Sequence, residues 1–328
     1  MTLYAISDIE DAITATRALL WPINGWRWAK LAVIVFFIGS VSGTSPFQFG
    51  GTGSVPNGGS GVSGSMPPMT GPVPGAVWVL VAVVALLVVA FVLIGSVMEF
   101  VFVRALQRET VTIRRDWSAY WPQGLRLFGF RLLLGAVSLG IIAVLILIVA
   151  APGVIGYEGV SAGFAVFAIP VAVVLALVAG LLNGFTTTFV VPIMLLEERG
   201  IIGAWRRFWP TLTAQWKQYL AYVVVGTVLR IAVGIAAGIV TALLAVVVAI
   251  PLGLLGVLGA VVITTAELAA GGLIIAIAVI AFVFAVTIIS LFVAVPMRTF
   301  LRYYALLILG DTEAEFDLIT ERRDAIRA

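Results

Sequence analysis

The sequence predicts an all-α, polytopic membrane protein with six transmembrane helices, arranged as three parallel two-span repeats around a pseudo-threefold axis. Three observations predict this fold class. Of the 328 residues, 62% are hydrophobic and 11% are charged, whereas soluble domains average about 45–50% and about 25%. Lys and Arg gather on alternate connections between the apolar runs, and a Trp-Pro segment recurs before every second run.

Six apolar runs are long enough to cross a bilayer, whose hydrocarbon core needs about 20 residues of helix. The runs lie at 26–44, 76–103, 127–150, 163–196, 218–250 and 271–308. The first run is not expected to be a cleaved signal peptide, because the acidic residues Asp8, Glu10 and Asp11 precede it. The apolar, glycine-rich stretch 251–263 is the best candidate for a re-entrant segment.

The connections between these spans predict their orientation. The external loop 45–75, together with 151–162 and 251–270, contains no Lys or Arg. Apart from Arg230, the basic residues lie on the other connections and at the chain ends, which predicts a plasma-membrane protein with both termini in the cytoplasm. Loop 45–75 is uncharged and rich in Gly, Ser, Thr and Pro, so we expect a flexible linker.

Three related segments precede the odd-numbered spans. Residues 113–122 and 201–210 place apolar side chains at the same helical spacing and end in Trp-Pro, and 13–22 is a weaker copy. Such spacing puts the aromatic rings on one helix face, where Trp anchors at the headgroup level. Proline disfavours helix in the preceding residue. Each segment therefore predicts an amphipathic interfacial helix, a break at Trp-Pro and a turn into the bilayer. The expected anchors are Trp21, Trp117, Trp121, Trp205 and Trp209.

These segments divide a single transmembrane domain, 1–310, into repeats of about 1–103, 104–196 and 197–310. Aromatic belts at three unrelated spans remain the alternative interpretation. The residues that follow, 311–328, predict a cytoplasmic tail helix, with acids at its start and Arg at its end. Thr312 and Glu315 have the spacing of a capping box.

Two stretches carry a family resemblance. Ile9-Glu10-Asp11-Ala12-Ile13 with Thr16-Arg17, and 191–198 leading into Gly203-Ala204-Trp205-Arg206-Arg207, resemble a broad group of uncharacterised prokaryotic six-span membrane proteins. That group includes haloarchaeal families of unknown function and the membrane domain attached to some glycerophosphodiester phosphodiesterases. The resemblance implies a fold and a membrane location, and it implies no activity.

An ionisable residue at membrane depth is a candidate functional residue. Arg230 lies 13 residues after Lys217, about 15–20 Å along a helix. Its best expected partner is Glu99, and the second is Asn183 with Thr187. This polar cluster is either a structural pair that fixes helix register or the centre of a carrier site.

The composition restricts the possible functions further. The chain has no Cys and no His, which removes thiol nucleophiles, histidine bases and zinc sites built from these ligands. No phosphate-binding loop occurs, so we expect no enzyme, metal or cofactor. The first prediction is a scaffold, assembly factor or regulator, whose partners are anionic lipid headgroups and a protein partner or a second copy. Nucleic acid is not expected, because the basic residues are dispersed. The alternative is a transporter or lipid-handling carrier with a central site around Arg230.

Overall fold

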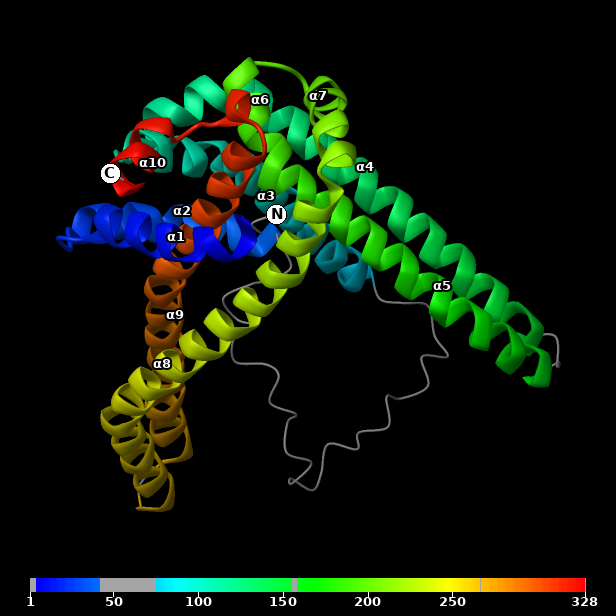
Figure 1. The fold of residues 1–328 in the computed structure, drawn as a ribbon. Coiled ribbons are helices and arrows are strands. Elements are labelled where there is room, and N and C mark those ends of the chain that lie inside the picture. The colour runs from blue at the N-terminus through cyan, green and yellow to red at the C-terminus, as the bar shows by residue number, and fades with distance from the viewer. Residues whose placement is uncertain (1–3, 42–74, 155–157, 266, 328) are drawn as a thin grey trace.

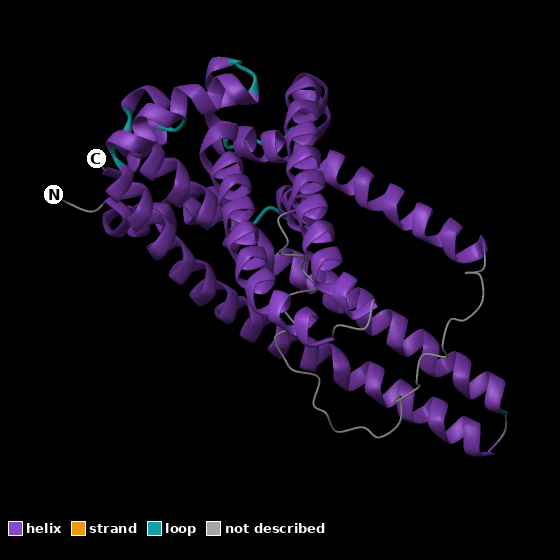
Figure 2. Cartoon of the chain, turned by 90° about the vertical axis from the view of Figure 1, so that its right-hand side faces the viewer, coloured by secondary structure: helices purple, strands orange, loops and turns teal. Residues whose placement is uncertain are grey.

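The structure, a computed structural model, describes residues 4–41, 75–154, 158–265 and 267–327, and all regular elements in these ranges are helical (Figure 2). The elements are α1 (Tyr4–Leu20), α2 (Gly25–Val41), α3 (Gly75–Arg108), α4 (Ile113–Val154), α5 (Glu158–Phe185), the π-helical turn η2 (Thr186–Val190), α6 (Val191–Glu197), α7 (Ile201–Ala214), α8 (Trp216–Thr265), α9 (Leu268–Thr312), the 3-10 turn η3 (Ala314–Phe316) and α10 (Thr320–Arg327).

Five helical segments among the described residues are long and apolar enough to cross a membrane. They are Val77–Arg108, Ile113–Ala150, Val166–Glu197, Trp216–Thr265 and Leu268–Thr312. They fit a multi-pass membrane protein, as the composition predicts. Helix α2 covers the part of the first predicted span that the structure describes. Most of the predicted linker 45–75 lies outside the described residues.

Two helical hairpins diverge from one end of the molecule (Figure 1). In one, α4 packs on α5, and in the other, α8 packs on α9. We call these hairpins the arms. The end from which they diverge, the head, contains α1, α6, α7 and α10, together with residues 96–108 of α3 and 294–312 of α9. The buried hydrophobic core lies mainly in this head.

The arms present apolar side chains on their outer surfaces. Leu133, Phe167, Leu243 and Phe284 are all largely exposed, as side chains that face lipid would be. In the head, by contrast, Phe189 is fully buried. Its ring centroid lies 4.9 Å from that of Tyr222, 5.2 Å from that of Tyr219 and 5.5 Å from that of Phe208. The chain therefore divides into a packed head and two arms with lipid-compatible surfaces.

The stretch 251–263, predicted as the best candidate for a re-entrant segment, is continuous helix. Helix α8 continues through Pro251 to Thr265. A proline removes one backbone donor, and the packing of α8 against α9 supports the helix past it. At the tip of this arm, a Cβ atom built on Gly271 would lie 2.4 Å from the carbonyl oxygen of Gly259. The two backbones approach too closely there for a side chain on Gly271.

The predicted break at Trp-Pro is present at one segment and wrong at two. Helix α1 ends at Leu20, directly before Trp21 and Pro22. Helix α4, however, continues through Pro122, and α7 continues through Pro210 to Ala214. Packing supports α4 here, because a Cβ on Gly124 would lie 2.8 Å from the Cα of Val97 on α3. The close contact with α3 accompanies a continuous helix where the proline alone favours a break.

The tail after α9 does not form the single helix that its charge pattern predicts. Helix α9 runs to Thr312, whose hydroxyl donates to the carbonyl of Ile308 within the same helix, so it caps no new helix. The turn η3 follows, and α10 begins only at Thr320. Phe316 and Ile319 are buried. The tail is therefore docked on the head.

Candidate functional site

A buried ion pair joins α3 to α9 in the head. Arg302 Nη2 lies 2.8 Å from Glu99 Oε1, and the two side chains are 7% and 3% exposed. A buried carboxylate or guanidinium is costly without a partner. Each side chain therefore depends on the other for its place in the core.

The turn η2 supplies the same arginine with a carbonyl acceptor. The N–H of Val191 bonds to the carbonyl of Thr186, five residues back, which is the π-helical pattern. The next donor in that pattern would be Pro192, which has no N–H. The carbonyl of Thr187 therefore lacks its helical partner, and Arg302 Nη1 donates to it at 2.8 Å. Pro192, two residues after the last residue of η2, thus leaves the carbonyl of Thr187 available to Arg302.

A second buried arginine comes from α4. Arg131 is 8% exposed. Its Nη1 donates to Ser96 Oγ at 3.1 Å, and its Nη2 donates to Thr187 Oγ1 at 3.0 Å. The charge of Glu99 acts on Arg131 and also on Arg298, one turn before Arg302 on α9. One carboxylate thus lies among three arginines.

We call Ser96, Glu99, Arg131, Thr187 and Arg302 the ion cluster. Some of its buried polar atoms, Glu99 Oε2 and the Nε atoms of Arg131 and Arg302, make no hydrogen bond within the described residues. The cluster is also linked to α7, because Trp205 Nε1 donates to Thr186 Oγ1 at 3.0 Å, beside Thr187. Its contacts tie α3, α4, η2 and α9 together.

With this geometry established, a comparison with known families places the chain. The model of a family described as "Family of unknown function (DUF7544)" matches residues 3–319. The chain belongs to the DUF7544 family. No curated protein and no solved structure matches it. The match covers the whole ion cluster and the tail as far as Ile319, whereas α10 lies beyond the matched region.

Arg230 of this DUF7544 chain lies outside the ion cluster. It is exposed on α8, and its Nη2 lies 3.3 Å from the hydroxyl of Tyr222 on the same helix. The predicted Glu99–Arg230 pair is therefore wrong, since Arg302 occupies the carboxylate. The physical reason is that the Arg230 side chain is exposed and reaches Tyr222 on its own helix, whereas Glu99 is buried beside Arg302.

Of the other predicted polar residues, two belong to the ion cluster and one does not. Glu99 and Thr187 both belong to the ion cluster, where Arg302 bridges them. Asn183, one turn before Thr187, is half-buried, and its Oδ1 has no hydrogen-bond partner in the described part of the chain. Ser96, Arg131 and Arg302 are the cluster residues that the sequence analysis missed as site residues. The available signal was the Thr186-Thr187-Thr188 run before Pro192, which indicates irregular backbone that a long donor can reach.

The five predicted tryptophan anchors of the DUF7544 chain have different environments. Trp205 is half-buried by its bond to Thr186, and the rings of Trp117 and Trp121 are 5.5 Å apart at the start of α4. Trp21 is 65% exposed and Trp209 is 57% exposed. The last two point away from the head core, while Trp205 supports it.

The chemistry open to the site is limited. In the part of the chain that the structure describes, no group of three acidic side chains is placed to hold a metal ion. The side chains of the ion cluster contact one another and the carbonyl of Thr187, while Glu99 Oε2 and the Nε atoms of Arg131 and Arg302 make no hydrogen bond within the described residues. This arrangement fixes the relative positions of helices, which is a structural task.

Proposed function

We propose that this DUF7544 protein is a six-span, non-enzymatic protein of the cytoplasmic membrane, and that its head is a rigid cytoplasmic scaffold with an assembly or regulatory role. The observation that carries the proposal is that the buried guanidinium of Arg302 contacts other parts of the protein. Its guanidinium is bonded to Glu99 on α3 and to the carbonyl of Thr187, and it is 7% exposed. A carrier would need such a charge to face a path for its substrate.

Two cavities in the described part of the chain are lined by residues outside the ion cluster. One lies between the end of α3 and the tail, and the other is an apolar groove formed by side chains of α2, α8 and α9. The ion cluster itself is buried between α3, α4, η2 and α9 and connects them.

The proposed threefold repeat has two supports. Glu99, Thr187 and Arg302 come from the first, second and third repeat in turn, and they meet in the head. In addition, α3 and α6 end in the same way, at Glu109 with φ 55° and at Glu198 with φ 53°. A non-glycine residue in this left-handed region costs about 1–2 kcal/mol, and the next helix begins within four residues of each.

The proposed six spans and cytoplasmic termini rest on the uncharged or acidic arm tips and the basic head. The relation to haloarchaeal families and to the phosphodiesterase membrane domain stays a prediction. The topology can be tested directly, because the chain has no Cys. Asp324→Cys places a thiol on the exposed side of the tail and Ala269→Cys places one at an arm tip. An impermeant maleimide should label Ala269→Cys in intact cells and Asp324→Cys only after lysis. The reverse pattern would overturn the orientation.

The scaffold role itself is tested by a high-resolution map of the purified protein in native-lipid discs. We expect close packing around Glu99 and Arg302, with no solvent path to either membrane face. A water-filled cavity or ion density that reaches one face from Arg302 would instead support the carrier.

A further inference from the structure

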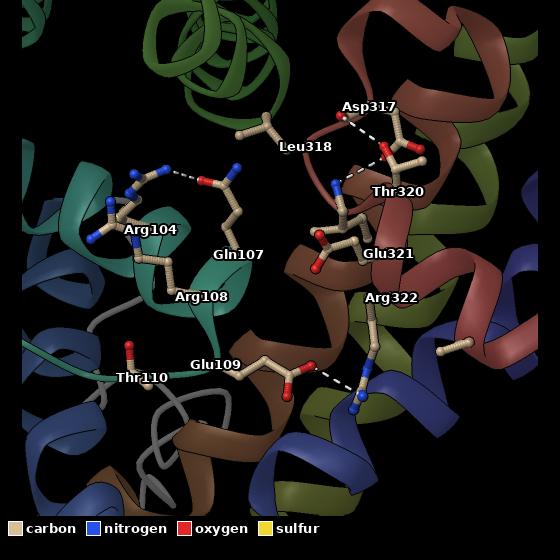
Figure 3. A pocket seen from close by; sticks show the side chains of 12 residues that line it. Arg104, Gln107, Arg108, Glu109, Thr110, Asp317, Leu318, Thr320, Glu321 and Arg322 are labelled. Atoms are coloured by element: carbon tan, nitrogen blue, oxygen red, sulfur yellow. Dashed lines mark hydrogen bonds and ion pairs between the residues drawn. The ribbon is translucent and has the colours of Figure 1, made fainter.

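A cavity of about 930 Å³ opens between the end of α3 and the tail. Figure 3 shows its two walls, one carrying Arg104, Gln107 and Arg108 and the other carrying residues 317–322. Ligand pockets in proteins typically enclose about 300–1,000 Å³. The volume is therefore enough for an ion or a small headgroup with its water.

The arginines of this cavity have bonding capacity that the protein does not use. Arg104 contacts the amide oxygen of Gln107, and its buried Nε has no partner within the described residues. Arg322 Nη1 lies 3.1 Å from Glu109 Oε1, while its buried Nε and Nη2 have no hydrogen-bond partner there. Arg108 is exposed and forms no ion pair among the described residues. Three guanidinium groups thus offer free N–H donors around one space.

Of the three acidic side chains that line the cavity, Glu109 and Asp317 form ion pairs with arginines. Glu109 is paired with Arg322, and Asp317 Oδ2 lies 3.0 Å from Arg323 Nη1, which also approaches Asp311. Glu321, which is exposed, forms no ion pair in the described part of the chain. On the α3 wall, Arg104 and Arg108 form no ion pair within the described residues, because the neighbouring carboxylate of Glu109 is paired with Arg322. An anion between the walls would meet attraction from this side.

The backbone at the cavity is held in an unusual conformation. Glu109 has φ 55° directly after α3 ends at Arg108. This left-handed position normally favours glycine. The glutamate instead directs its carboxylate to Arg322 across the cavity (Figure 3). The strained residue thus links the two walls and sets their spacing.

We propose that this cavity binds a phosphate-bearing anion, held by Arg104 and Arg108 on one wall and by Arg322 on the other. Guanidinium groups present a planar fork of donors that matches two phosphate oxygens. The ligand chemistry is the same for free phosphate compounds and for an anionic phospholipid headgroup at the membrane surface. Because the tail forms one wall, a bound anion would also hold the tail against α3.

The test uses the full chain in discs of phosphatidylcholine, with pyrophosphate as the soluble probe and calorimetric binding as the readout. The variant is Arg104→Gln with Arg108→Gln. The matched control is Arg114→Gln with Arg115→Gln, which removes the same charge from exposed positions on α4 outside the cavity. We expect pyrophosphate to bind the natural protein, to bind the cavity variant at least about tenfold more weakly, and to bind the control within about twofold.

A second experiment distinguishes the source of the phosphate. Discs that contain phosphatidylglycerol are prepared without soluble phosphate, and the lipid retained by the protein is measured by native mass spectrometry. Retention that the cavity variant loses and the control keeps supports a lipid headgroup, whereas pyrophosphate binding alone supports a soluble ligand. Failure of both probes to bind, or equal losses in the two variants, would overturn the proposal.

Two precautions keep these outcomes interpretable. If the double variant fails to fold, Arg108→Glu at its exposed position should produce the same loss of binding, and an unchanged affinity would overturn the proposal. The measurement with soluble pyrophosphate also does not depend on the orientation of the protein in the membrane. Its failure is therefore distinguishable from failure of the proposed scaffold topology.

Discussion

Arg302 of α9 contacts Glu99 of α3 at 2.8 Å, and the same guanidinium donates to the carbonyl of Thr187 at 2.8 Å. One side chain thereby joins three segments that lie far apart in the sequence. Since all three meet in the head from which the arms diverge, this contact determines how the arms are held relative to one another (Figure 1). The predictions below follow from it and from the docked tail.

The first prediction concerns the loss of one buried charge. Arg302→Leu removes the ion-pair partner of Glu99 and the donor to the carbonyl of Thr187, so we expect a loss of about 3–5 kcal/mol in the free energy of unfolding. Combining it with Glu99→Leu should restore much of the stability. Thermal unfolding of the purified protein measures both. Arg199→Leu, at an exposed ion pair, is the control and should cost less than about 1 kcal/mol. A double variant no more stable than Arg302→Leu alone would contradict this account.

A second prediction isolates the hydroxyl of Thr187. Thr187→Val keeps the side-chain shape and removes the acceptor of Arg131 Nη2. A buried hydrogen bond to a charged group is worth about 1.5–3 kcal/mol, which is the expected loss. Thr188→Val is the matched control, because the Thr188 hydroxyl makes no hydrogen bond within the described residues. Equal melting temperatures for the two variants would show that the contact with Arg131 adds nothing.

A third prediction concerns pH and the tail. Burial and the nearby charge of Asp311 raise the pKa of Asp8 from 3.8 to about 7, against the smaller opposing effect of Arg327. Between these pH values the folded protein holds a proton that the unfolded chain has released. The free energy of unfolding should therefore fall as the pH rises through this window and level off above about pH 7.

Melting temperatures measured from pH 5 to pH 8.5 test this dependence. Asp8→Asn, which is neutral at every pH, should flatten the curve. Glu10→Gln, at an exposed position on the same helix, should leave it as in the natural protein. An unchanged slope in Asp8→Asn would assign the pH dependence to another group.

The arms and the membrane class follow from the sequence because their cause is local. Runs of apolar residues dictate helices whatever their neighbours, and the predicted spans 76–103 and 271–308 lie inside α3 and α9. The ends of helices were predicted less well. Pro122 favours a break, but α4 continues through it, packed against α3 where Gly124 meets Val97. Where a contact between two helices decides whether a helix continues, the local sequence pattern cannot predict the helix end.

The site could be predicted only in part, for a related reason. Glu99 and Thr187 stand out as polar residues in apolar spans. Arg302 and Arg131 do not, because basic residues near span ends usually lie at the surface. Arg230 was misplaced because depth along a helix gives no direction for the side chain.

The central claim, that the ion cluster is a dry lock between helices, is tested most directly by the accessibility of Ser96. This residue is fully buried, and its hydroxyl accepts from Arg131. Ser96→Cys, in a chain with no other thiol, is treated with a small, impermeant methanethiosulfonate in right-side-out and inside-out vesicles. Ala269→Cys at the exposed arm tip serves as the reactive control. The account predicts no labelling of the Ser96→Cys thiol from either side, while the control reacts from one. Labelling of Ser96→Cys, above all from both sides, would contradict it and indicate a carrier path.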